Sequence, residues 1–289
     1  MFSFLPQRGE QQPYRTFKKV STLIILLLVC TLSTRTLDAT RNSSNSFSEK
    51  PKVSAKADLV IQSDFIRVAV VKACVGDAFE RISRASLENG LNYSKSHGYD
   101  FFIVNEETFP ETTFFSPPAW VKVAYLRDLL VSKRSFHWFF WLDCDTLILR
   151  PEVPFESVLQ EMNVTDDHDL AFTEDDPNNQ GIAPFNSGMF LLRNSVWAKD
   201  ELSRVLRLAA KAEIRNHGLW EQEALRRLYV ANENSEHLKI LIASKRWKFN
   251  AFDRLQEETN ETFIWHRTAC RVQPKCDDMY LLRASQVQF

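Results

Sequence analysis

The sequence WFFWLDCD, residues 138–145, combines a run of large apolar residues with two aspartates two positions apart. A short, uninterrupted apolar run of this kind is typical of a strand that is buried on both faces. Ligands of open α/β sheets bind beyond the carboxyl ends of such strands. We therefore expect Asp143 and Asp145 at the rim of a binding site, on one side of the chain, with Cys144 pointing back into the apolar core.

Strands and helices alternate on the N-terminal side of this run. Residues 66–73 and 101–104 are short β-branched or aromatic runs that predict buried strands. Residues 79–97 have apolar positions at helical spacing and end before Gly98, which favours a helix with a glycine stop. A second helix is predicted over residues 120–133. The order strand, helix, strand, helix, strand indicates a mainly parallel α/β sheet.

The C-terminal half continues this alternation, and no second hydrophobic unit is set off by a linker. Short strands are predicted at residues 170–173, 189–192, 240–243 and 263–265, and helices at residues 196–211 and 219–229. The expectation is an α/β fold in one domain over residues 65–289.

Two aspartates on one side of the chain suit a divalent cation. Mn²⁺ and Mg²⁺ prefer carboxylate oxygens, and either ion, held by Asp143 and Asp145, would neutralise charge that develops on a leaving phosphate. Asp-x-Asp is a frequent pattern, and the alternative is a solvated turn that Thr146 caps. Because the pair follows a buried aromatic strand, we favour the metal site.

Two further polar groups stand at the start of predicted elements. Asn186 and Gly188 come just before a strand, where the glycine would allow close backbone approach and the amide could bind sugar hydroxyls. The alternative for them is a plain turn. Glu221 and Gln222 open the last predicted helix, whose dipole explains the carboxylate but not the amide, so this pair is a second candidate.

A histidine follows the last predicted strand. The imidazole of His266 is a candidate metal ligand, although a lone histidine is more often a partly buried polar residue with a satisfied partner. Arg271 comes shortly afterwards, and its planar guanidinium group suits phosphate oxygens.

The N-terminal region differs from the rest of the chain. Arg15, Lys18 and Lys19 precede an apolar run over residues 20–32, which fits either a secretory signal peptide or an uncleaved signal-anchor. The run is shorter than an ordinary spanning helix, but no small-residue cleavage site follows it, so we favour the anchor. We predict a cytosolic tail, an anchor, a flexible stem and a lumenal catalytic domain at residues 1–19, 20–36, 37–64 and 65–289.

The lumenal assignment bears on the cysteines and on the glycosylation sequons. Cys74 and Cys144 lie in apolar strand contexts and are expected as buried thiols, whereas Cys270 and Cys276 could pair in an oxidising compartment. No CxxC pair is present, which argues against a structural zinc site. Asn-x-Ser/Thr sequons occur at Asn42, Asn92, Asn163 and Asn260.

The composition argues against two other classes of protein. A formal net charge of −1 gives no basic excess for binding nucleic acid. The chain has 22 Phe and 7 Trp, which favours a packed aromatic core over a disordered protein. With only 7 Gly, it has little room for a glycine-rich phosphate loop.

The order of these candidate sites resembles glycosyltransferase family 34, the galactosyl-, mannosyl- and xylosyltransferases of fungi and plants. The matching stretches are YSKSHGY at 93–99, WVK at 120–122, WFFWLDCD at 138–145, NSGMFLLRNS at 186–195, EQEAL at 221–225 and HRTAC at 266–270. The ordered set carries the resemblance, which spans about residues 66–271.

The resemblance implies a GT-A fold and a retaining glycosyltransferase on the Golgi membrane, with single-pass type II topology. It implies a nucleotide-sugar donor, with a UDP-sugar favoured over GDP-mannose, and a glycan or glycoprotein acceptor. The membrane is a partner through the anchor, nucleic acid is not a partner, and a homo- or hetero-oligomer is compatible with the family.

The resemblance also implies roles for single residues. The implied ligands of Mn²⁺, or of Mg²⁺ in its place, are Asp143, Asp145 and His266. The implied donor-binding residues are Asp143, Lys122, Asn186, Gly188 and Arg271. The implied catalytic residues are Gln222, close to the anomeric carbon, and Glu221 beside it.

The chain departs from the family pattern outside the metal set. Asn89-Gly90 replaces a usual Asn-Lys, Ala269 replaces a usual Gly, and Trp220 stands where some members carry an acid, which bears on donor identity and acceptor docking. One alternative is a catalytically silent member that acts as a structural subunit of a Golgi glycosyltransferase complex. The intact Asp, Asp and His set argues against it. The other is a transferase of a different GT-A group, against which the HGY and HRTAC elements argue.

Overall fold

The computed structural model describes residues 66–110, 117–179, 183–234, 239–268 and 274–289. The predicted tail, anchor and stem lie outside these residues. Within the described ranges, no helix is both long and apolar enough to cross a membrane.

A six-stranded sheet forms the centre of the domain, in the order β2-β1-β3-β6-β5-β7. Its strands are β1 Val68–Ala73, β2 Asp100–Val104, β3 Trp138–Asp143, β5 Leu170–Glu174, β6 Phe185–Arg193 and β7 Ile240–Ala243. The sheet is mainly parallel, as expected, with β6 as its antiparallel strand, since β6 runs antiparallel to both of its neighbours. The connection from Glu174 to Phe185 is shorter than the dozen or so residues that a parallel crossover needs.

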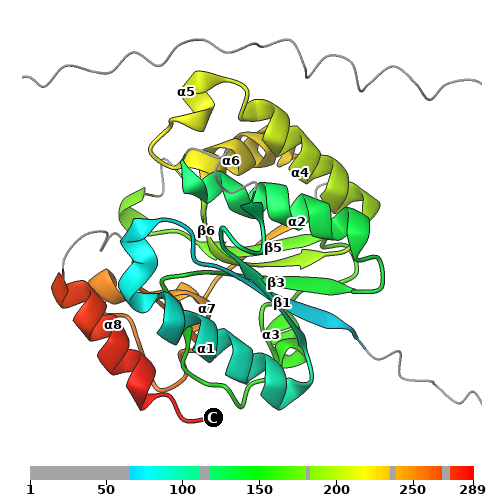
Figure 1. Cartoon of the computed structure of the whole chain (residues 1–289). Helices are drawn as coiled ribbons and strands as arrows, with labels where there is room; N and C mark the ends of the chain where they lie inside the picture. The colour runs from blue at the N-terminus through cyan, green and yellow to red at the C-terminus, as the bar shows by residue number, and fades with distance from the viewer. Residues whose placement is uncertain (1–65, 111–116, 180–182, 235–238, 269–273) are drawn as a thin grey trace, which may run out of the picture. The chain divides into compact units, whose positions relative to one another are not determined.

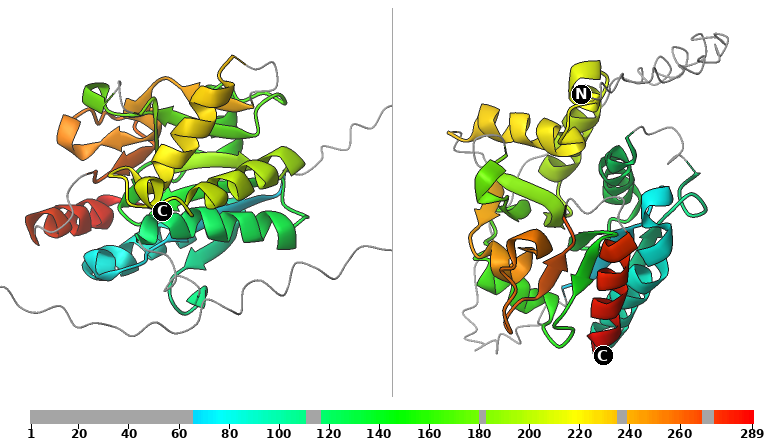
Figure 2. Two further views of the ribbon diagram at one scale, coloured as in Figure 1. Left: turned by 90° about the horizontal axis from the view of Figure 1, so that it is seen from above. Right: turned by 90° about the vertical axis from the view of Figure 1, so that its left-hand side faces the viewer.

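Helices cover both faces of this sheet (Figure 1). The helices are α1 Glu80–His97, α2 Val121–Ser132, α3 Phe155–Glu161, α4 Val196–Leu208, α5 Ala212–Arg215, α6 Trp220–Asn232, α7 Arg246–Phe249 and α8 Pro274–Gln286. Short 3-10 helices are η1 Asp77–Phe79, η3 Pro118–Trp120, η4 Pro177–Asn179 and η5 Asp253–Leu255. Helix α8, red in Figures 1 and 2, packs alongside α1.

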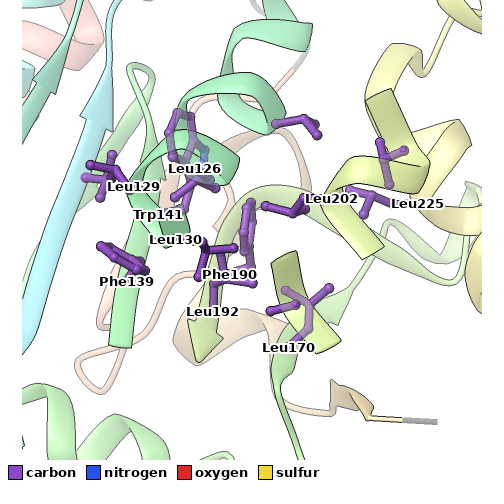
Figure 3. Close-up of a cluster of buried hydrophobic side chains, with 14 of the residues drawn as sticks. Leu126, Leu129, Leu130, Phe139, Trp141, Leu170, Phe190, Leu192, Leu202 and Leu225 are labelled. Atoms are coloured by element: carbon purple, nitrogen blue, oxygen red, sulfur yellow. The ribbon is translucent and has the colours of Figure 1, made fainter. Parts of the chain in front are cut away.

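The alternation of side chains along β3 divides the core into two layers. Phe139 and Trp141 point to the face covered by α2, α4 and α6, whereas Phe140 and Leu142 point to the face covered by α1 and α3. Figure 3 shows leucines of α2 packed against Phe139 and Trp141. Large apolar side chains on both faces are what hold β3 at the centre of the sheet.

A second, three-stranded sheet brings the C-terminal region to the end of β3. It consists of β4 Thr146–Ile148, β9 Ile264–His266 and β8 Ala251–Phe252, in the order β4-β9-β8. In the antiparallel pair β4 and β9, Thr146 lies opposite His266. The sequence did not predict β4, β8, α3, α7 or α8.

Most predicted elements are present with shifted ends. Helix α1 ends at His97 and is followed, as predicted, by Gly98, whose left-handed backbone (φ 71°) favours glycine. Asn186 and Gly188 lie inside β6 rather than before a strand, because β6 begins at Phe185. Cys144 and Asp145 lie in a turn and not on extended backbone.

The prediction of buried thiols at Cys74 and Cys144 is wrong, since the two form a disulfide with a Cα–Cα distance of 4.8 Å. Ala73 and Asp143 are register partners on neighbouring strands, so the residues that follow them lie side by side. Cys276 is also disulfide-bonded, while Cys270, the partner that the sequence suggested, lies outside the described residues.

Candidate active site

A cleft of about 580 Å³ opens beyond the carboxyl ends of β1 and β3. This volume lies within the usual range for small-molecule sites. The cleft is lined by residues that follow β1, by the start of β6, by the start of α6 and by the segment after β9. Of the predicted site residues it includes Asp143, Asp145, His266, Lys122, Asn186, Gly188, Glu221 and Gln222. Arg271 lies outside the described residues.

Asp143, Asp145 and His266 converge at one side of this cleft. One ligand atom from each lies within 4.8 Å of the others. The end of β3 presents Asp143 and the turn after it presents Asp145, while the pairing of β4 with β9 brings in the histidine, with Nε2 3.3 Å from Asp145 Oδ1. Two carboxylates and an imidazole form a suitable ligand set for Mn²⁺ or Mg²⁺.

The charges around Asp145 also fit a cation at this position. Burial alone would raise the pKa of Asp145, but His266 and Arg267 outweigh it and hold the pKa below its usual value. Asp145 is therefore ionised at neutral pH. An ionised oxygen beside an imidazole nitrogen offers a favourable position for a metal ion between the two atoms.

Gly188 gives the imidazole its space. A Cβ at this position would lie 2.9 Å from His266 Nε2 and 3.0 Å from Asn186 Oδ1, and closer still to His266 Cε1. The close backbone approach expected at this glycine is thus made by the ring of His266.

Lys122 is buried behind the aspartates and does not face open solvent. Its Nζ lies 3.0 Å from Asp143 Oδ1 and 3.0 Å from Glu221 Oε1, and it donates to Ser187 O at 2.8 Å. Burial would lower the pKa of Lys122, but the two carboxylates outweigh it and raise the pKa, so the ammonium stays charged. Trp141 Nε1 also donates to Asp143 Oδ1, at 2.7 Å. These contacts fix the orientation of Asp143.

Glu221 is the second carboxylate that contacts the buried ammonium group of Lys122. Burial raises its pKa in spite of the neighbouring Lys122 charge. Its Oε1 accepts a hydrogen bond from Ser187 Oγ at 2.9 Å, while Oε2 has no hydrogen-bond partner within the described ranges. A carboxylate held in this way is suited to orienting its neighbours.

The amide of Gln222 connects β6 to the loop that follows β5. Its Oε1 accepts from Ser187 N at 2.9 Å, and its Nε2 donates to Asp175 Oδ2 at 3.0 Å. Asp175 is buried, which raises its pKa. Both ends of the amide are therefore fixed at the wall of the cleft.

Lys72 lies beneath the aspartate turn. Its side chain is fully buried, and Nζ donates to Thr146 O at 2.7 Å. Burial lowers the pKa of Lys72 to about 7, although Asp145 and Asp143 act in the opposite direction.

We expect this lysine to make stability depend on pH. Between about pH 7 and the ordinary value of 10.5 the unfolded chain binds a proton that the folded chain releases, so the free energy of unfolding rises with pH. A Lys72→Met chain should lack that rise. Urea unfolding of both chains across this window, in a chelator, measures the difference, and parallel profiles would show that Lys72 stays charged when folded.

Sequence reasoning missed three polar residues near the cleft. Lys72 interrupts an apolar strand, and a charge in a buried strand is a usable indication of a special role. Asp175 and Asn250 lie outside regular elements, and no periodicity marks them.

A family model spans most of the domain and matches residues 65–277. The chain belongs to the galactosyl transferase GMA12/MNN10 family. The resemblance to glycosyltransferase family 34 is thereby confirmed.

Curated relatives of this GMA12/MNN10 family member match part of their length. The probable alpha-1,6-mannosyltransferase MNN10 of Saccharomyces cerevisiae is 29% identical over 169 residues, which are 51% of this chain and 42% of the relative. Xyloglucan 6-xylosyltransferase 2 of Arabidopsis thaliana is 26% identical over 180 residues, which are 61% of this chain and 37% of the relative. The chain thus spans less than half the length of these relatives.

The fold is GT-A-like. A glycosyltransferase involved in the glycosylation of the major capsid of PBCV-1 has a TM-score of 0.57 to it at 17% identity, over 74% of this chain and 99% of that one. At this identity the comparison concerns the fold alone.

Proposed function

We propose that the chain is a metal-dependent glycosyltransferase that moves a hexosyl or pentosyl group from a nucleotide-diphosphate sugar to a glycan acceptor, with retention of anomeric configuration. The observation that carries the proposal is the convergence of Asp143, Asp145 and His266 at the cleft, in a member of a glycosyltransferase family. Bound there, Mn²⁺ or Mg²⁺ would neutralise charge on the departing diphosphate.

The residues around this set have separate proposed roles. Lys122 and Glu221 keep Asp143 in place through a buried ion pair. Gln222 presents its amide to the donor sugar, close to the anomeric carbon. Gly188 and Asn186 shape the wall beside His266, and Arg271 is proposed to bind donor phosphate oxygens.

Activity assays with a set of donors test this function. The full-length chain is incubated with Mn²⁺ and either UDP-galactose, UDP-xylose, UDP-glucose or GDP-mannose, and sugar release and transfer to glycan acceptors are measured. We expect turnover of one donor, with a UDP-sugar favoured, and its loss in excess chelator. Turnover that resists chelation would contradict the metal role.

A catalytically silent subunit of a glycosyltransferase complex is the second candidate. The intact ligand set and the fixed Gln222 amide argue against it. A silent chain would neither transfer nor hydrolyse any of the donors, even where it binds Mn²⁺, so the same assays separate the two functions.

We propose that the chain is a single-pass type II protein of the Golgi membrane, with the catalytic domain in the lumen. The basic flank before residues 20–32 supports this topology, and the sequon residues Asn92, Asn163 and Asn260 are exposed. Endoglycosidase treatment should increase gel mobility. An unchanged mobility, with a C-terminus that protease reaches in intact microsomes, would refute it.

A further inference from the structure

A chain of hydrogen bonds runs from the backbone of β6 to the imidazole of His266. Gly188 N donates to Asn186 Oδ1 at 2.9 Å, and Asn250 Nδ2 donates to the same oxygen at 3.0 Å. Asn250 Oδ1 lies 2.9 Å from His266 Nδ1. Asn250 is completely buried and His266 almost so, which leaves water little access to these groups.

The direction of each bond follows from the first. A backbone N–H can only donate, so the atom of Asn186 that faces Gly188 must be the oxygen. The Asn250 atom that meets the same oxygen must then be the NH₂ group. The remaining atom of Asn250 is therefore an oxygen, which can only accept, and His266 Nδ1 must carry a proton.

A second contact supports the same orientation of Asn186. Asn186 lowers the pKa of the neighbouring Asp175 carboxyl group, which suits an NH₂ group turned toward that carboxyl. The position of Asp175 thus agrees with the orientation that the Gly188 N–H fixes. The Asn186 oxygen already accepts two hydrogen bonds from the protein, so a hydrogen bond to a sugar hydroxyl would come from its NH₂ group.

We propose that Asn250, oriented through Asn186 by the backbone N–H of Gly188, is a positioning residue that keeps the proton of His266 on Nδ1. Nε2, which faces Asp145 Oδ1 at 3.3 Å, then carries the lone pair that a metal ion needs. The proposal rests on the metal site of the proposed function. It explains why an asparagine, Asn250, is buried beside His266.

Metal-ligating histidines depend on such a partner for ring orientation and ligand basicity, and removal of the partner lowers metal affinity by about 10- to 100-fold. Without Asn250, the buried Nδ1–H of His266 would have no acceptor. The ring would then gain by moving its proton to Nε2, where Asp145 Oδ1 is an acceptor and where the proton blocks the metal.

The full-length protein with ¹⁵N-labelled histidine tests the assignment directly. Two-bond ¹H–¹⁵N spectra, with the His266 signals identified by their loss in His266→Gln, should show Nδ1 protonated both without metal and with Mg²⁺. The wild-type spectrum does not depend on whether any Asn250 variant folds. An unprotonated Nδ1 would overturn the proposal.

Metal binding supplies the second readout. Asn250→Ala should weaken Mn²⁺ binding by about 10- to 100-fold. The matched control is Thr173→Val, which removes the other acceptor of Asn250 Nδ2, at 3.1 Å, and leaves the His266 contact intact. Equal Mn²⁺ affinity in the two variants would overturn the proposal, whereas a wild-type chain that binds no Mn²⁺ but has Nδ1 protonated would overturn only the proposed function.

Discussion

An Asp145→Asn chain should transfer sugar about 10²- to 10³-fold more slowly than the wild type, with its fold retained. The substitution keeps the shape of the side chain and removes one of the two carboxylates in the Asp143, Asp145 and His266 set. A neutral amide is a poor ligand for a hard divalent cation. The NH₂ group of the new amide can donate a hydrogen bond to His266 Nε2. This hydrogen bond helps the variant to keep its fold when no metal is bound.

Mn²⁺ binding and turnover at saturating donor measure this effect. Asp253→Asn is the matched control, because Asp253 lies near Asp145 and His266 but is not in the convergent ligand set. We expect the control to keep Mn²⁺ affinity and most of its activity. Equal activity in both variants, or full Mn²⁺ affinity in Asp145→Asn, would refute the metal site.

The order of strands and helices was predictable because burial on both faces gives a strand a continuous apolar run. The strand over Trp138–Asp143 and the helix that ends at Gly98 both follow this rule. The sequence analysis did not assign a direction to β6, although the short connection before this strand excludes a parallel crossover. The C-terminal helix α8 was missed because its apolar face is weak and two of its large side chains, Met279 and Leu282, remain exposed.

The sequence predicted those site residues that directly follow a clearly apolar strand. Asp143, Asp145 and His266 end apolar runs, and the sheet pairing of β4 with β9 brings the three together. That pairing joins residues far apart in the chain, and no local pattern encodes it. Asn250 acts through burial and hydrogen-bond direction, which only the folded chain reveals, whereas Lys72 can be recognised in the sequence as a charge inside an apolar strand.

The disulfide between Cys74 and Cys144 could have been predicted from the pairing of the two strands that precede these cysteines. Cys74 and Cys144 each follow the last residue of neighbouring parallel strands. Each cysteine considered alone, beside an apolar strand, suggested a buried thiol. Once the two strands are paired side by side, the two cysteines must lie close together. The bond closes a long loop and fixes the residue between the two aspartates.

The second large effect is expected from a single methyl group, in Gly188→Ala. The added Cβ would lie 2.9 Å from His266 Nε2 and nearer to Cε1, distances that real side chains do not adopt. Gly188 lies in a strand without a left-handed backbone, so the glycine is needed for space and not for conformation. The ring of His266 must shift from its present position, and we expect Mn²⁺ affinity and transfer to fall by about 100-fold.

Gly218→Ala is the matched control for this substitution. Gly218 also lines the cleft, but a Cβ there would meet no atom within 4 Å. The control should keep both Mn²⁺ affinity and activity. Mn²⁺ titration and donor turnover of the two alanine variants, side by side, separate the loss of space at His266 from a general effect of alanine in the cleft.

A double-mutant cycle identifies the ring of His266 as the group that the methyl displaces. Overpacking at Gly188 should lower the free energy of unfolding by about 1–3 kcal/mol in the wild-type background. In a His266→Ala background the ring is absent, so the same methyl should cost much less, and the two substitutions should couple by about 0.5–3 kcal/mol. Additive effects in urea unfolding would place the clash elsewhere, and the glycine would then have no part in holding the histidine opposite Asp145.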